Sequence, residues 1–386
     1  MFINKNEKLF VRRRDFVKTS ALAGLTVALP HINLFATDPE VVNGWYERLA
    51  DALNQLPNSF PRTQSNIEIT LLKKIFLPEE ANMAGQLTKD SESVSEIAKR
   101  TGFSEEETDT RLRTMAGHGL VWGNPDAKMY RLAPFVVGIY ESQMVRMDHE
   151  LAHLVEEYFQ QSGFQLMAYQ PALHRVIPAH GTVKTEWILP YDRLVELMNS
   201  CNTFRVNDCI CRKQQDLLGK RKCTFPLHVE LIFYTGNVTS DPPVPPFVTR
   251  EEALAVLQKT EKIALVHTVS NVDEGVHYVC NCCGCCCGIL RGITEAGIKN
   301  SVAAANYYSE VDPEKCVGCG NCIKRCHMKA IASIDGVSVV DRTKCIGCGL
   351  CASGCASQAA VIKLKPENEI IHPPKDFATW EQERLM

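Results

Sequence analysis

The chain has 386 residues, of which 45% are hydrophobic and 23% charged, a balance typical of globular proteins with material for two to four domains. Its net charge is −3, and because residues 1–36 carry a surplus of four positive charges, the remainder is at about −7. This charge excludes a general electrostatic attraction to nucleic acid. All 18 cysteines except Cys201 lie in residues 209–355 at close spacings. Such spacing lets several thiolates meet at one inorganic centre, whereas disulfide frameworks usually spread their cysteines across loops.

The N-terminal segment, residues 1–36, resembles a twin-arginine export signal. Two arginines followed by a phenylalanine and a lysine carry the resemblance, and these are Arg13, Arg14, Phe16 and Lys18. An apolar run from Thr19 to Leu29 follows, which is shorter than the about 20 residues of a membrane span. We therefore expect export of the folded protein to the periplasm. An uncleaved signal would instead anchor the chain in the membrane, and a basic N-terminal helix of a cytoplasmic protein is the other interpretation.

Residues 37–64 are expected to form a linker helix, and residues 65–135 resemble a winged helix in the order of their elements. Ser104 and Glu107 form a capping-box pattern that opens the helix in the recognition position. That helix starts with three glutamates, and its only cations are Arg111 and Arg113. Because contact with phosphates needs a positive face, we expect packing or partner docking here and no binding of nucleic acid.

The middle of the chain is expected to hold a connecting helix in residues 136–175 and an α/β domain in residues 176–300. An amphipathic stripe at helical spacing predicts the helix. Strands are predicted at 229–234, 264–269 and 276–280, and a capping box at Thr249 and Glu252 predicts a helix between the first two. The segment has no glycine-rich phosphate-binding motif, so nucleotide binding has no local support.

Two cysteine runs near the C-terminus share the pattern C-x-x-C-x-x-C-x-x-x-C, and the second follows the first by 29 residues at every position. This duplication resembles a bacterial two-[4Fe–4S] ferredoxin domain, here residues 301–364, in which each run's fourth cysteine ligates the cluster of the other run. His327 and Ala356 stand where such domains usually carry proline. Zinc and disulfides are alternatives that two matched runs disfavour. The resemblance implies one cluster at Cys316, Cys319, Cys322 and Cys355, and a second at Cys345, Cys348, Cys351 and Cys326.

A second group of cysteines lies in residues 209–287. A tetrahedral site needs four ligands, and the three cysteines of residues 209–223 reach that number only by pairing with the run at 280–287. We therefore predict a third iron–sulfur cluster between these segments, with a structural zinc ion or a redox-active disulfide pair as alternatives. Its candidate ligands are Cys209, Cys211, Cys223, Cys280, Cys282, Cys283 and Cys285.

These features together predict an α+β protein of several domains: a winged-helix-like N-terminal domain, a cysteine-rich α/β middle domain, a dicluster ferredoxin-like C-terminal domain and a tail at 365–386. The arrangement is similar to a family of multicluster ferredoxin-like proteins of anaerobic bacteria. That resemblance implies electron transfer to or from a redox partner protein or an oxidoreductase complex, with no established reaction. The alternatives are a reductase with a substrate-binding cluster in residues 209–287 and a redox-sensing DNA-binding regulator.

Overall fold

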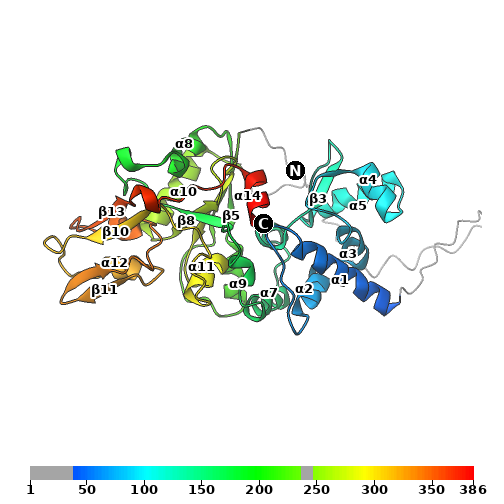
Figure 1. Ribbon diagram of the computed structural model, residues 1–386, viewed down its shortest axis with the longest axis horizontal. Coiled ribbons are helices and arrows are strands. Elements are labelled where there is room, and N and C mark those ends of the chain that lie inside the picture. Colours follow the sequence, from blue (N-terminus) through cyan, green and yellow to red (C-terminus); the bar gives the residue numbers. More distant parts are fainter. Residues whose placement is uncertain (1–37, 236–246) are drawn as a thin grey trace, which may run out of the picture. The chain divides into compact units, whose positions relative to one another are not determined.

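The computed structural model describes residues 38–235 and 247–386 (Figure 1). The predicted export signal, with Arg13, Arg14, Phe16 and Lys18, lies outside the described residues. Among the helices that are described, none combines the length and the apolar character needed to cross a membrane.

The described residues contain both α-helices and strands, and the strands pair into four sheets. The helices are α1 (Pro39–Asn54), α2 (Ile67–Ile75), α3 (Pro78–Ala84), α4 (Val94–Thr101), α5 (Glu105–Gly117), α6 (Tyr140–Ser142), α7 (His149–Gln161), α8 (Leu194–Asn199), α9 (Ile210–Leu217), α10 (Arg250–Lys262), α11 (Gly288–Thr294), α12 (Asn321–Arg325), α13 (Leu350–Ser353) and α14 (Phe377–Arg384). The strands are β1 (Glu92–Ser93), β2 (Val121–Asn124), β3 (Met129–Leu132), β4 (His174–Ile177), β5 (Thr203–Asp208), β6 (His228–Tyr234), β7 (Phe247–Val248), β8 (Val266–Ser270), β9 (Tyr278–Cys282), β10 (Tyr307–Val311), β11 (Ile331–Ile334), β12 (Val337–Val340) and β13 (Ala360–Leu364).

In the N-terminal part, β1, β3 and β2 form a small antiparallel sheet beside α4 and α5. The element order from α3 to β3 is helix, strand, helix, helix, strand and strand. Ser104 caps α5 by accepting a hydrogen bond from the Glu107 backbone N–H, as its position in the sequence predicts. The resemblance of this segment to a winged helix stays a prediction.

A six-stranded antiparallel sheet with the order β4-β8-β9-β6-β5-β7 forms the middle of the chain. Strands β6, β8 and β9 lie where the sequence predicts strands, although β9 begins two residues later than expected. The capping box of Thr249 and Glu252 opens α10, which confirms the predicted helix. This helix packs against β5 and β6 and so covers one face of the sheet.

The cysteines of β9 point to the other face of this sheet. Side chains alternate between the two faces of a strand, so Cys280 and Cys282 share one face and Asn281 points to the opposite one. Asn281 hydrogen-bonds His267 of β8, which contacts Glu261 of α10. Cys280 and Cys282 therefore lie on the face away from α10.

Residues 307–364 contain two copies of one strand–helix–strand unit. The first copy is β10, α12 and β11, and the second is β12, α13 and β13. The outer strands β10 and β13 pair with each other, and the inner strands β11 and β12 form a hairpin, so each sheet takes one strand from each copy. Figure 1 shows the two sheets close together with α12 beside β11. The duplication in the sequence thus appears in the fold as two copies, each of which contributes one strand to each sheet.

The predicted connecting helix of residues 136–175 is interrupted. It forms α6 and α7, and Asp148 starts α7 anew because its side chain accepts a hydrogen bond from the Leu151 backbone N–H. The predicted tail contains α14, whose Trp380 is buried and donates to the Ala172 carbonyl. Arg384 is also buried and donates to the carbonyls of Pro57 and Leu166. Residues 40–386 consequently form one compact unit with a continuous core.

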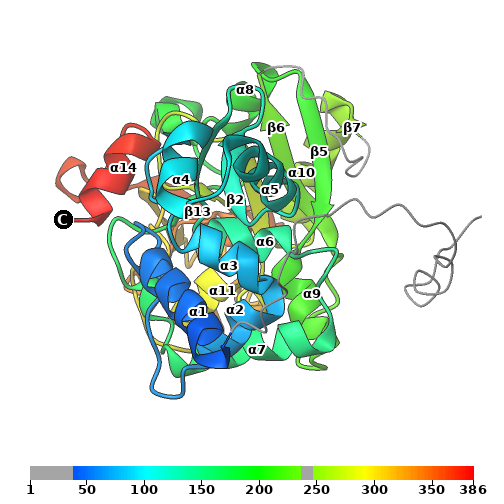
Figure 2. The ribbon, with the colours of Figure 1, turned by 90° about the vertical axis from the view of Figure 1, so that its right-hand side faces the viewer.

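Helices α7, α9 and α11 lie side by side (Figures 1 and 2) and are joined by one buried carboxylate. Glu156 of α7 accepts hydrogen bonds from Gln214 and Gln215 of α9 and forms an ion pair with Arg291 of α11. Both charged side chains are at most 5% exposed, so each charge is shielded from water and depends on the other. The pair fixes α9 and α11, and both helices begin next to cysteines.

We expect Glu156→Ala to lower the free energy of unfolding by about 2–4 kcal/mol, because it leaves the buried Arg291 guanidinium with the more exposed Glu295 as its remaining carboxylate partner. Anaerobic urea unfolding followed by circular dichroism measures this change. The matched control is Glu157→Ala, the partly exposed neighbour on the same helix, for which we expect less than about 1 kcal/mol. Equal losses in the two variants would contradict the role of Glu156.

Candidate metal centres

The C-terminal cysteines form two groups, each with members from both runs. In the inner group, Cys326 of the first run lies with three cysteines of the second, and all four line one cavity together with apolar side chains that include Met328 and Ile346. Burial, together with the nearby Cys345 and Cys326 sulfurs, raises the pKa of the Cys351 thiol to about 11. The cysteines of this cavity are Cys326, Cys345, Cys348 and Cys351.

The outer group lies nearer the surface. The pKa of the Cys316 thiol is lowered by the backbone N–H groups of Ser338 and Gly318, and the Cys355 sulfur is near enough to oppose that shift. Cys319 is exposed and Cys322 is buried. The fourth thiol of this group, Cys355, belongs to the second run, as the crossed ligation predicts. The residue-by-residue assignment to the two clusters stays a prediction.

Hydrogen bonds that involve sulfur repeat across the two copies. The thiol of Cys322 donates to the hydroxyl oxygen of Ser338 over 3.2 Å, and that of Cys351 donates to the hydroxyl oxygen of Ser309 over 3.1 Å. The two serines are 29 residues apart, like the cysteines, and each serves the third cysteine of the other copy. The backbone N–H groups of Ala330 and Ala360 donate to Cys326 and Cys355 over 3.3 Å. These donors suit sulfurs that carry negative charge when they bind iron.

The loops between these cysteines pass very close to neighbouring backbone. A Cβ atom at Gly347 would lie 2.4 Å from the Tyr307 carbonyl oxygen, and the φ of +72° at this position favours glycine. Gly318 has the same restriction at the matching position of the first run, against the Gly336 carbonyl. The chain can therefore fold tightly round a group held between the thiols.

The comparison with family models agrees with this geometry. Residues 309–356 match the model of the 4Fe-4S dicluster domain. These residues bind two [4Fe–4S] clusters. The match covers both cysteine runs, and the four thiols that line one cavity provide the donor set that such a cluster needs. No curated protein and no solved structure matches the chain.

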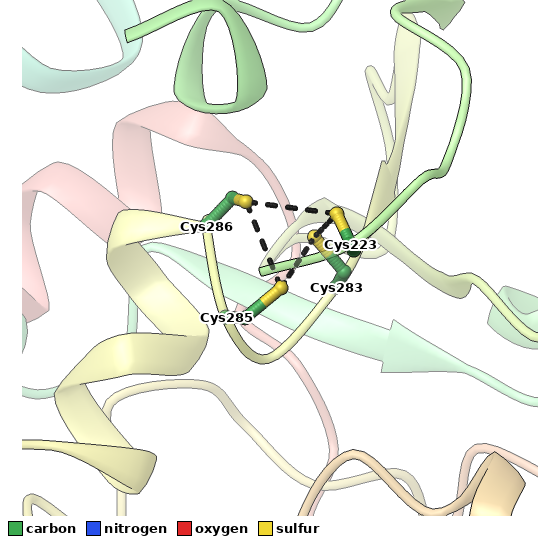
Figure 3. Close-up of side chains that lie close together, drawn as sticks. All are labelled: Cys223, Cys283, Cys285 and Cys286. Carbon is green, nitrogen blue, oxygen red and sulfur yellow. Dashed lines mark hydrogen bonds between the residues drawn. The ribbon is translucent and has the colours of Figure 1, made fainter. Parts of the chain in front are cut away.

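The cysteines of the middle segment fall into two groups instead of one. The first, here called the four-thiol group, contains four sulfurs that all lie within 4.8 Å of one another. The sulfur–sulfur distances are 3.9 Å from Cys223 to Cys283, 3.8 Å from Cys223 to Cys286, 3.7 Å from Cys283 to Cys285 and 3.6 Å from Cys285 to Cys286 (Figure 3). The four-thiol group is Cys223, Cys283, Cys285 and Cys286.

One sulfur of the four-thiol group carries most of the negative charge. The pKa of the Cys283 thiol is far below its usual range because Cys285 and Cys286 donate to its sulfur and the Arg212 guanidinium lies beside it. The Cys283 thiolate in turn raises the pKa of the Cys285 thiol to about 12. Further loss of protons from this group therefore needs an added positive charge.

The second set, here called the five-thiol group, lies on the face of the sheet away from α10. Two of its members come from β9, two flank the start of α9, and one precedes α11. The thiols interact in a chain from Cys280 to Cys282, then to Cys287, Cys211 and Cys209, and Cys209 and Cys280 also approach each other. The five-thiol group is Cys209, Cys211, Cys280, Cys282 and Cys287.

Polar groups surround the five-thiol group. The pKa of the Cys211 thiol is lowered well below its usual range by hydrogen bonds from Cys209 and Cys287 and from the Gly288 backbone N–H. Glu230 of β6 contacts Cys280, and burial raises the pKa of its carboxyl group. A charged carboxylate among thiolates is costly unless cations lie nearby, and Arg212 is 3.7 Å from Glu230.

The seven predicted ligands of a third cluster are thus divided between the groups. Cys209, Cys211, Cys280 and Cys282 belong to the five-thiol group, and the sequence interpretation missed Cys287 beside them. The other three predicted residues belong to the four-thiol group, where Cys286 was missed. The signal that separates them is the alternation along β9, which turns Cys280 and Cys282 to one face before the chain leaves the strand.

The remaining single candidates have structural partners. Cys201 lies apart from both groups, with its sulfur 3.5 Å from the Leu197 carbonyl oxygen. His267 bridges Asn281 and Glu261 on the α10 face, and His277 hydrogen-bonds the Gly275 carbonyl. His267 lies in β8 and His277 directly precedes β9, so both histidines have structural partners.

Serine variants of the C-terminal cysteines test the crossed ligation. We expect Cys326→Ser and Cys345→Ser to lose the same electron paramagnetic resonance (EPR) signal, because both thiols belong to the inner cavity. Cys316→Ser and Cys355→Ser should both lose the other signal. Each variant should contain about four iron atoms fewer than the wild type, whereas Cys201→Ser should match the wild type. Loss of one signal by Cys316→Ser and Cys326→Ser together would contradict the crossing.

Proposed function

We propose that the protein is an electron-transfer protein that connects a redox partner at its surface to a third cluster in its cysteine-rich middle segment. One hydrogen bond carries the proposal. The Gly284 backbone N–H donates to Nδ1 of His327 over 3.3 Å, and His327 directly follows Cys326. This contact joins the loop of the inner cluster to the loop that supplies both middle thiol groups.

His327 occupies the position where dicluster domains usually carry proline, and its two nitrogens have defined roles. Nε2 lies 2.6 Å from the Ala264 carbonyl oxygen, so it must donate, and Nδ1 must accept from Gly284. A Cβ atom at Gly284 would lie 3.0 Å from the His327 carbonyl oxygen, so the two loops touch along their backbones. Proline at 327 could form neither hydrogen bond. The departure from the usual sequence therefore supports a connection specific to this chain.

Surface exposure gives the proposed order of the sites. Val317, between two cysteines of the outer group, is 73% exposed, and Cys319 beside it is also exposed. A redox partner protein can approach the outer cluster there. The inner cavity is covered by residues 179–182, where the Ala179 backbone N–H donates to the Cys348 carbonyl. The order supported is partner, outer cluster, inner cluster and five-thiol group.

The five-thiol group has the donor set for the third cluster. It offers five thiols where a [4Fe–4S] cluster needs four, and the Arg212 guanidinium near Cys209 and Glu230 offsets negative charge. When bound, such clusters take up and release single electrons. The chain's own residues hold the thiolates, exclude water and set the potential through hydrogen bonds to sulfur.

The same proposal includes the place of action. A protein that acquires its clusters in the cytoplasm must leave it folded, and the twin-arginine route carries folded proteins, which favours the periplasm. An uncleaved signal would add a membrane anchor.

Docking of a protein is favoured over nucleic acid at α5, because Arg111 and Arg113 are paired with Glu107 and Asp109.

A reductase is the second candidate function, and one observation favours it. The hydroxyl of Tyr278 lies 2.8 Å from Nε2 of His174, on the same face of β9 as Cys280 and Cys282. Burial lowers the pKa of His174 to about 4, so the imidazole is neutral at pH 7 and can accept a hydrogen bond from the tyrosine hydroxyl. Steady turnover of a small substrate would favour this candidate over electron transfer alone.

The paired serines predict how the chain tunes its two C-terminal clusters. We expect Ser309→Ala to lower the reduction potential of the inner cluster and Ser338→Ala to lower that of the outer cluster, because each variant removes a hydroxyl in contact with a cysteine sulfur that would donate to it once the thiol has lost its proton to bind iron. Potentiometric titration followed by EPR measures both. Each variant is the control for the other, and a shift of both potentials by either substitution would contradict the pairing.

The third cluster is tested by metal content. We expect Cys211→Ser and Cys280→Ser each to lose about four iron atoms and about four sulfides per chain while both signals of the dicluster segment remain. Cys201→Ser is the matched control, since it removes a buried cysteine outside every thiol group among the described residues. Unchanged iron and sulfide in both variants would refute the third cluster at this site.

A further inference from the structure

The four-thiol group has a geometry that differs from every other cysteine group in the described part of the chain. We propose that Cys223, Cys283, Cys285 and Cys286 bind one zinc ion as a closed tetrahedral site, separate from the iron–sulfur clusters. This site is independent of the electron-transfer proposal, because it rests on the distances among four sulfurs and on the charges around them.

The distances fit a single metal ion. With zinc–sulfur bonds of about 2.3 Å, the edges of a tetrahedron of thiolates measure about 3.8 Å. Four of the six sulfur–sulfur distances run from 3.6 to 3.9 Å, and all six are within 4.8 Å. Figure 3 shows the four sulfurs turned toward a common centre from two segments of the chain. The thiolates of a [4Fe–4S] cluster each bind a different iron atom and must lie farther apart.

The surroundings fit a closed structural site. Cys283 and Cys286 are buried and pack with Val229 and Leu265 in a small apolar cluster, with Phe225 against it. Four thiolate ligands leave no open coordination position for a substrate or a solvent molecule, which is the usual difference between structural and catalytic zinc sites. The fourth ligand, Cys223, comes from the segment between α9 and β6, so the ion would tie that segment to the loop at 283–286.

The charge balance favours an ion that stays divalent. Four thiolates and one zinc ion carry a net charge of −2, and two arginines lie beside them. Arg212 is fully buried, approaches Cys283 to 3.8 Å, and has no hydrogen-bond partner for its Nε and Nη2 atoms among the described residues. Arg221 lies beside Cys223 and Cys286. A single iron ion in this site would change the charge with each electron and disturb the balance, whereas zinc has no redox chemistry.

The zinc ion would also fix the loop on which both other sites depend. Cys282 and Cys287, at the two ends of this loop, point into the five-thiol group, and Gly284 in its centre contacts His327. The ion would hold the residues between these contacts. It would therefore set the distance between the five-thiol group and the inner cavity without taking part in redox chemistry.

The test is zinc analysis and zinc X-ray absorption on the full chain, purified anaerobically. We expect about one zinc ion per chain, with four sulfur neighbours at about 2.3 Å. Cys223→Ser should lose the zinc while the dicluster EPR signals remain, and Cys201→Ser should keep it. Cys223→His should retain zinc with three sulfur neighbours and one nitrogen, because zinc accepts this ligand set. That variant keeps the test informative if loss of the metal prevents folding.

Three results would overturn the proposal. The wild-type protein could lack zinc, the absorption spectrum could show fewer than four sulfur neighbours, or the site could contain iron. Retention of zinc by Cys223→Ser, together with its loss from Cys211→Ser, would place the ion in the five-thiol group and overturn the assignment equally.

Discussion

Repulsion between neighbouring thiolates is the constraint on which this structure depends. Each cysteine group brings several sulfurs close together, so one thiolate makes it harder for its neighbours to lose their protons. The opposite pKa shifts of Cys283 and Cys285 show this effect. Hydrogen-bond donors, the nearby Arg212 and Arg221 and, when the sites are filled, metal cations offset this repulsion. We therefore expect folding and metal binding to be coupled throughout residues 209–355. The ion pair of Glu156 and Arg291 supports this region from outside by fixing the helices that begin at its cysteines.

The contact between Gly284 and His327 places the loop of the middle thiol groups next to the loop of the inner C-terminal group. Two segments that are 43 residues apart in the sequence meet at one backbone N–H, and each carries a cysteine next to the contact. The outer cysteines reach the surface at Cys319, and the five-thiol group lies on the face of the sheet away from α10. The electron path that we propose, from the surface to the sheet, rests on these positions.

Local patterns in the sequence predicted much of this fold. The matched cysteine runs predicted an internal duplication, which the fold shows as two strand–helix–strand copies, and the capping residue Thr249 predicted the start of α10, because both signals depend on nearby residues alone. The division of the middle thiols could not be predicted, since it depends on which face of β9 each cysteine takes and on where Cys223 lies in space. The burial of α14 was missed for the same reason: Arg384 contacts Pro57, which is 327 residues away in the sequence.

The most direct measurement is the number of electrons that the protein takes up. Anaerobic coulometric titration of the fully loaded chain counts redox-active centres and ignores zinc. The account predicts about three electrons per chain, one for each of the two clusters in residues 309–356 and one for the five-thiol group. An uptake of about two electrons would contradict it.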